Sequence, residues 1–132
     1  MEKTKKADPE TLMRSGRWDD AVDALNAILA KGKTAAKAKA LELLEKCAEH
    51  STYAATTLAL ALLRGDSGQT DLDRGVALLR EVLQNDDETM HHAAHFFLAY
   101  YYLGIFGGPS DAIAALGHFE EGGLRGNAES AY

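Results

Sequence analysis

The sequence repeats itself at a shift of 40 residues, and this repeat restricts the fold more than any other feature. Leu58 and Ala59 fall on Leu98 and Ala99 at this shift. Without a gap, the same shift aligns Gly68 with Gly108, Asp71 with Asp111, Gly75 with Ala115, Val76 with Leu116 and Leu79 with Phe119. A unit of this length cannot bury its apolar face alone, so it must stack on its neighbours. Such a chain is expected to offer a surface to a partner rather than a reaction centre.

The residue composition predicts an all-α fold. Pro9 and Pro109 are the only prolines among 132 residues, and alanine and leucine dominate long stretches without β-branched runs. A chain of this length fits one domain. We expect a charged N-terminal tail over residues 1–7 and a single helical-repeat domain over residues 8–132.

Helical spacing of apolar residues, together with capping residues and glycines, predicts about seven helices. Their connections are short, so successive helices should lie antiparallel as neighbours. A short C-terminal stub is expected to start at Asn127. The predicted helices span residues 8–15, 18–31, 34–48, 51–64, 71–84, 88–103 and 111–122.

The repeated residues resemble those of Sel1-like repeats, which are relatives of the tetratricopeptide repeat. One copy contains Ala94, Leu98, Ala99, Tyr102, Asp111, Ala115, Phe119, Gly126 and Asn127. The preceding copy contains Ala54, Leu58, Ala59, Leu62, Gly65, Asp71, Gly75 and Leu79. The resemblance is strong from about residue 54 onward, although both copies carry alanine (Ala59, Ala99) where the family has glycine.

The resemblance implies a right-handed α-solenoid of antiparallel helix pairs. Members of the family are adaptors and scaffolds that bind protein partners, and they share no catalytic residues. An immunity protein or a secretion accessory protein would fit this pattern. We therefore expect a non-catalytic protein-interaction module.

Charge and hydropathy exclude several classes of partner. The formal net charge of -6, with both signs interspersed, makes a nucleic-acid backbone a poor ligand. No segment has the apolar length of a membrane span, and no signal-peptide core follows the charged start. We expect a cytoplasmic protein with a protein partner and no contact with nucleic acid or membrane. Cys47, the single cysteine, is expected to be a small buried hydrophobe.

One short motif resembles the sequence of a catalytic site. Gly65-Asp66-Ser67-Gly68 matches the sequence around the nucleophilic serine of trypsin-like enzymes. That chemistry needs a base, an orienting carboxylate and an oxyanion hole on a β scaffold, and no segment here has strand periodicity. The glycines are explained by a turn between two helices. We expect no enzymatic activity and no cofactor.

Three histidines on one predicted helix give the main alternative to a pure binding role. His91 and His95 are spaced i, i+4, and His92 and His95 are spaced i, i+3, so either pair could chelate Zn²⁺ or Ni²⁺. The acidic residue that a metalloprotease motif needs after its first histidine is missing. Two interpretations of these histidines stay open. In one, the protein binds or senses a metal ion through them, and in the other, they are surface residues without a special role.

Partner binding is expected on a stripe that runs beside the core face of two helices. His92, Phe96, Tyr100 and Leu103 share this stripe at i, i+4, i+8 and i+11. The 40-residue shift adds Thr56 and Leu60 from the preceding repeat. Aromatic residues on such a face are typical interface anchors, so we expect a groove with an acidic rim. The alternative is that these side chains pack against neighbouring helices.

The C-terminal end offers a second candidate surface. Ile113, Leu116 and Phe119 lie on the packing side of the last full helix, and only a stub follows. An uncovered apolar surface here would support self-association, as in a homo-oligomer or a self-assembling structural repeat. The alternative is that Leu124, Ala128 and Tyr132 fold back over it.

Overall fold

The computed structural model describes residues 8–66 and 68–130, with side chains as far as residue 123, and all regular structure in this part of the chain is helical. The all-α class is thereby confirmed. The helices are α1 (Pro9–Arg14), α2 (Trp18–Lys31), α3 (Thr34–Cys47), α4 (Thr52–Arg64), α5 (Leu72–Gln84), the 3₁₀ turn η1 (Glu88–Met90), α6 (His91–Tyr102) and α7 (Ala112–Ser130). The predicted tail over residues 1–7 lies outside the described residues.

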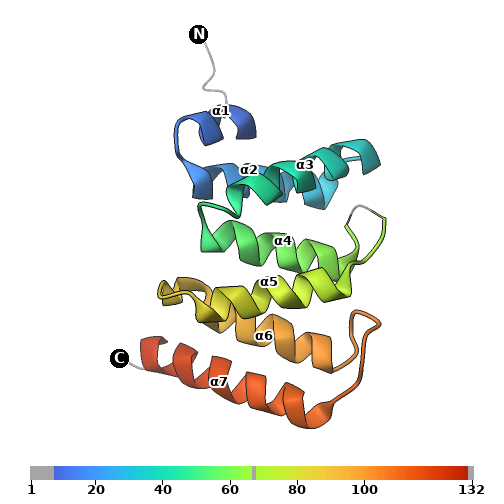
Figure 1. Cartoon of the computed structure of the whole chain (residues 1–132), viewed down its shortest axis with the longest axis vertical. Coiled ribbons are helices and arrows are strands. Elements are labelled where there is room, and N and C mark those ends of the chain that lie inside the picture. Colours follow the sequence, from blue (N-terminus) through green and yellow to red (C-terminus); the bar gives the residue numbers. More distant parts are fainter. Residues whose placement is uncertain (1–7, 67, 131–132) are drawn as a thin grey trace.

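The helices form a stack from α1 at one end to α7 at the other, with α2 and α3 side by side at about the same level (Figure 1). Each α-helix contacts the next along the chain, because the short connections fold it back on its predecessor. Contacts also join α2 with α4 and α4 with α6. Contacts therefore run through α2, α4 and α6, and α3, α5 and α7 each contact their chain neighbours among these three helices.

The helices start where the sequence provides a cap. The side chains of Asp8, Ser51 and Asp71 each accept a hydrogen bond from the backbone N–H three residues on, at 2.8, 3.1 and 3.1 Å. Gly65 ends α4 in the left-handed conformation, with φ of 76°. Local chemistry therefore sets most of the helix boundaries.

The repeat is visible in the core. Leu58 and Ala59 on α4 and Leu98 and Ala99 on α6 all have no exposed surface. Gly75 on α5 is buried against α4, where an added Cβ would lie 2.9 Å from the Leu63 side chain. The small residues at these positions let helix backbones approach closely.

Two predicted boundaries were wrong. Residues 88–103 form a 3₁₀ turn followed by α6, rather than one helix. The last helix does not end near residue 122 with a stub at Asn127, because α7 continues through both glycines to Ser130. Gly122 lies against α6, and a Cβ there would lie 3.2 Å from the His95 Cβ. This glycine permits close helix packing and does not end the helix.

No helix in the described residues is long and apolar enough to cross a membrane.

Candidate docking groove

Thr56, one of the residues of the expected partner-binding stripe, does not line a groove. This side chain is 1% exposed, and its Oγ1 donates a hydrogen bond to the Thr52 carbonyl oxygen at 2.8 Å. The prediction for Thr56 is therefore wrong, because its face of α4 is turned into the core. Leu60 is half-buried, and Leu103, beyond the end of α6, is 46% exposed.

Three members of the stripe, His92, Phe96 and Tyr100, pack against α7, as the alternative held. The ring centroids of Phe96 and Tyr100 lie 5.7 and 5.6 Å from that of Phe119. His92 Nδ1 lies 2.8 Å from the Gly122 carbonyl oxygen, and it must donate because a carbonyl only accepts. Phe119 is consequently half-buried, contrary to the expectation that it lies on an uncovered surface. The aromatic stripe holds the last two helices together.

The histidines of α6 do not converge on a common point. His91 Nε2 lies 3.0 Å from the Asn85 carbonyl oxygen, His92 faces Gly122, and His95 Nδ1 lies 3.1 Å from His118 Nδ1. The described residues contain no group of three His, Cys, Asp or Glu side chains placed to hold a metal ion. The alternative of a metal site at His91, His92 and His95 gains no support from this arrangement, because each of the three rings has a different partner.

The serine motif lies only partly within the described residues. Ser67 lies outside them, whereas Gly65 ends α4 and Asp66 pairs with Arg64 at 2.7 Å. Cys47 is buried, as expected, and burial raises the pKa of its thiol. A thiol held protonated is a poor nucleophile.

An open groove of about 710 Å³ lies along the edge of the molecule where successive helices meet. It is lined by residues 16–20, 48–53, 55, 81–82, 85, 87 and 89–90, and we call it the docking groove. These residues come from the α1–α2 turn, the α3–α4 turn and the α5–α6 connection, which lie one beneath another at the left of Figure 1. Stacking of the helices therefore assembles a surface from three distant segments.

The start of α4 forms the centre of the groove and is tied to both sides of it. Ser51 Oγ accepts the capping bond from Ala54 N–H and donates to Asp19 Oδ1 of α2 at 2.6 Å. Next in the chain, Thr52 Oγ1 donates to Asp87 Oδ2, just before η1, at 3.2 Å. Asp19 and Asp87 are thus held on opposite sides of one helix N-terminus, whose partial positive charge favours carboxylates.

Aromatic side chains make one wall. The rings of Trp18 and His50 are stacked, with centroids 4.0 Å apart and planes within 6° of parallel. Beside them, the Tyr53 hydroxyl donates to Asp23 Oδ1 at 2.6 Å, and this bond raises the pKa of Tyr53. The wall combines flat apolar surface with fixed polar groups, which is the character of a protein-binding site.

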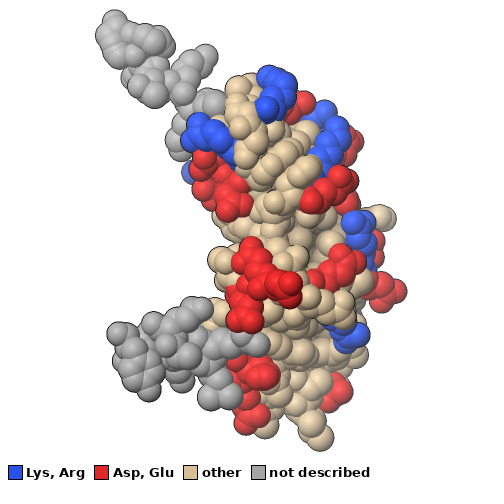
Figure 2. All heavy atoms as spheres, turned by 60° about the vertical axis from the view of Figure 1, so that its left-hand side comes forward, with Lys and Arg blue, Asp and Glu red and all other residues tan. Residues whose placement is uncertain are grey.

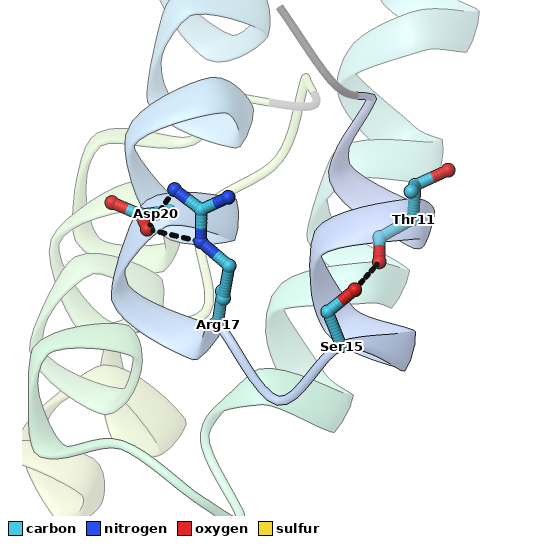
Figure 3. Close-up of polar contacts among 4 residues, drawn as sticks. All are labelled: Thr11, Ser15, Arg17 and Asp20. Atoms are coloured by element: carbon cyan, nitrogen blue, oxygen red, sulfur yellow. Dashed lines mark hydrogen bonds and ion pairs between the residues drawn. The ribbon is translucent and has the colours of Figure 1, made fainter.

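The groove is strongly acidic. Its lining includes the carboxylates of Asp19, Asp20, Glu49, Glu81 and Asp87. Arg17 is the one arginine or lysine among the lining residues, and its guanidinium contacts Asp20 at 2.8 Å within the first turn of α2 (Figure 3). Figure 2 shows acidic side chains gathered over the middle of this side of the molecule, with basic ones mainly toward the N-terminal end. Hydrogen bonds from Thr89 lower the pKa of Asp87, which keeps this carboxyl ionised.

From the sequence, a groove with an acidic rim was expected at the stripe that includes Thr56 and Tyr100, and the docking groove described here was missed. Trp18 and His50 are 32 residues apart in sequence, and no periodicity connects either of them with Asp87. The available signal was local: Trp18, Ser51 and Asp87 all stand at predicted helix starts. When helices stack, the helix ends that lie on the same side of the stack become neighbours. The residue pattern within a single helix does not reveal these neighbours.

Comparison with known protein families, with curated proteins and with solved structures finds no match to this chain. The arrangement of the docking groove is therefore the main support for a function.

Proposed function

We propose that this protein is a non-catalytic adaptor that binds a segment of a protein partner in the docking groove. The observation that carries the proposal is the groove itself, an open volume of about 710 Å³ with a stacked aromatic wall and fixed carboxylates. Concave sites with apolar surface and a few placed polar groups are the usual binding sites of proteins. The Sel1-like resemblance supports the same role, with the helices as a right-handed solenoid acting in the cytoplasm without a cofactor.

The groove is built to be rigid before it binds. Its centre is anchored by Ser51 and Thr52 to carboxylates on either side, and its wall by the Trp18–His50 stack. A surface that is already ordered loses little conformational entropy on association. Pre-organisation therefore favours docking of a flexible partner segment onto this side of the stack.

Site-specific photo-crosslinking tests this function. A benzoylphenylalanine residue replaces the exposed Glu49 in the groove, and in a matched variant it replaces the exposed Lys39 on α3, outside the lining. We expect a discrete cross-linked partner from the Glu49 variant in cells, and competition by excess unmodified protein. Equal products from both positions, or products from Lys39 alone, would contradict the proposal.

A second candidate function is self-association through α7. Ile113 and Leu116 are 85% and 58% exposed on this last helix, as expected from the sequence. Apolar side chains grouped on one helix face favour contact with another copy. Sedimentation over a concentration series distinguishes this function: self-association should be abolished by Ile113→Glu and unaffected by Glu49→Gln.

A further inference from the structure

We infer that the occupant of the docking groove is an extended segment carrying several arginine or lysine side chains. This inference rests on the proposed function and adds the chemistry of the partner. Three features of the groove lead to it: its charge, the direction of its hydroxyl groups, and the spacing of its carboxylates.

The first feature is unbalanced charge. Five carboxylates line the groove, and Arg17 is paired with Asp20. Asp19 and Asp87 accept their hydrogen bonds from uncharged hydroxyl and backbone groups. Their negative charge therefore persists across the groove, and a cationic partner is the complementary one.

The second feature is the direction in which the hydroxyl groups of the groove donate. Each hydroxyl of the lining residues already gives its one proton to an acidic residue: Ser51 to Asp19, Tyr53 to Asp23, and Thr52 and Thr89 to Asp87. An ionised carboxylate can accept about four hydrogen bonds, so acceptor capacity remains. Guanidinium and ammonium groups, which only donate, match this acceptor capacity.

The third feature separates a peptide from a metal ion. The carboxylates come from α2, the α3–α4 turn, α5 and the segment before η1, and the described residues include no group of three that could hold one ion. Charge spread along a groove matches several cations spaced along a chain. The Trp18–His50 wall offers an apolar surface for the aliphatic stems of these side chains.

Trp18 provides a direct readout, because it is the only tryptophan of the chain and lies in the groove wall. Three peptides without aromatic residues are titrated while its fluorescence is followed. They have identical glycine and alanine spacing and carry four arginines, four glutamines or four glutamates. We expect saturable binding of the arginine peptide, weakened as salt rises from about 0.05 to about 0.5 M, because exposed charges are then screened.

A pair of double variants tests the position of the charges. Glu49→Gln/Glu81→Gln removes two groove charges that have no capping role, whereas Glu42→Gln/Glu120→Gln removes two exposed charges outside the lining. Net charge changes equally in both. We expect the groove variant to bind the arginine peptide roughly fivefold more weakly, as for two exposed ion pairs, and the control variant to bind as the wild type does.

Each outcome is decisive. Equal binding of the arginine and glutamine peptides, or an equal loss in both double variants, overturns the inference and leaves the proposed function standing. Preference for the glutamate peptide also overturns it. If none of the three peptides binds, the inference fails, and the cross-linking experiment at Glu49 decides separately whether the groove binds a protein.

Discussion

Asp71 and Asp111 make the same two hydrogen bonds in successive repeats. The backbone N–H of Asp71 donates to Leu62 O at 2.9 Å, and that of Asp111 donates to Tyr102 O at 2.7 Å. Both side chains then accept from the backbone N–H three residues on, each at 3.1 Å. One aspartate per repeat therefore closes the inter-helix loop and caps the second helix of the pair.

These caps should stabilise the fold by similar amounts. We expect Asp71→Ala and Asp111→Ala each to lower the free energy of unfolding by about 1 kcal/mol, the usual contribution of an N-cap. Urea denaturation monitored by circular dichroism measures the change. Asp73→Ala is the control, because Asp73 is an exposed residue of the same first turn and lies inside the helix, past its cap. A loss at Asp73 as large as at Asp71 would mean that charge near the helix start, and not the cap, is responsible.

Gly75 should resist replacement by alanine, even though alanine is the better helix former. A Cβ at this position would lie 2.9 Å from Leu63 Cγ and 3.1 Å from the Ala59 carbonyl oxygen, and Leu63 is fully buried. Overpacking of this kind destabilises by roughly 1–3 kcal/mol, which exceeds the gain in helix propensity of about 1 kcal/mol. We expect a lower melting temperature for Gly75→Ala.

The same substitution should cost less stability when its neighbour Leu63 is made smaller. In a Leu63→Ala background the close approach to Leu63 Cγ is gone and only the 3.1 Å approach to the Ala59 carbonyl oxygen remains, so Gly75→Ala should destabilise less than in the wild type. Such non-additivity between touching residues is measured by a double-mutant cycle. Additive effects would show that Leu63 is not the obstacle.

Phe96 should contribute to stability rather than to partner binding. Its ring lies against Phe119, with centroids 5.7 Å apart and planes at 51°. We expect Phe96→Ala to lower the unfolding free energy by about 2 kcal/mol, and the Phe96/Phe119 cycle to show a coupling of about 1 kcal/mol. Binding of the arginine peptide per folded molecule should stay unchanged. If the Phe96→Ala variant folds as well as the wild type but loses peptide binding, Phe96 belongs to the partner-binding surface and the prediction is wrong.

Stability should fall in mild acid because of His118. Burial lowers the pKa of this side chain, and Arg80 adds to the effect while Glu121 opposes it. The unfolded chain therefore takes up the proton first as pH falls. The contribution of neutral His118 to stability is complete above the unfolded pKa of about 6.5 and is lost as pH falls through the lowered folded pKa.

The geometry around His118 reinforces this direction. Its Nδ1 lies 3.1 Å from His95 Nδ1, so one nitrogen must donate and the other accept, and protonation of both would place two N–H groups face to face. His118→Asn retains a polar side chain and removes the titration. We expect the wild type to lose more stability than His118→Asn between about pH 7.5 and about pH 5.5. Equal losses in urea melts would exclude a role for His118.

The sequence alone was sufficient for the helices and for most of their boundaries. Capping at Ser51 and Asp71 depends on a backbone N–H three residues away, and the buried positions of Leu58 and Leu98 follow from apolar spacing within one helix. Such interactions are local, so a short window of residues contains both partners. The 40-residue repeat likewise identifies equivalent positions from residue identities alone.

Only the tertiary packing decided which face of each helix is exposed and which is covered by a neighbouring helix. Thr56 and Phe96 are equivalent in the repeat, yet Thr56 is buried in the core and Phe96 packs on α7. The docking groove, and the His95–His118 pair, join residues from segments that meet only when the helices stack. Contact between distant segments depends on the relative placement of whole helices, a property that side-chain packing determines and that no local pattern of residues contains.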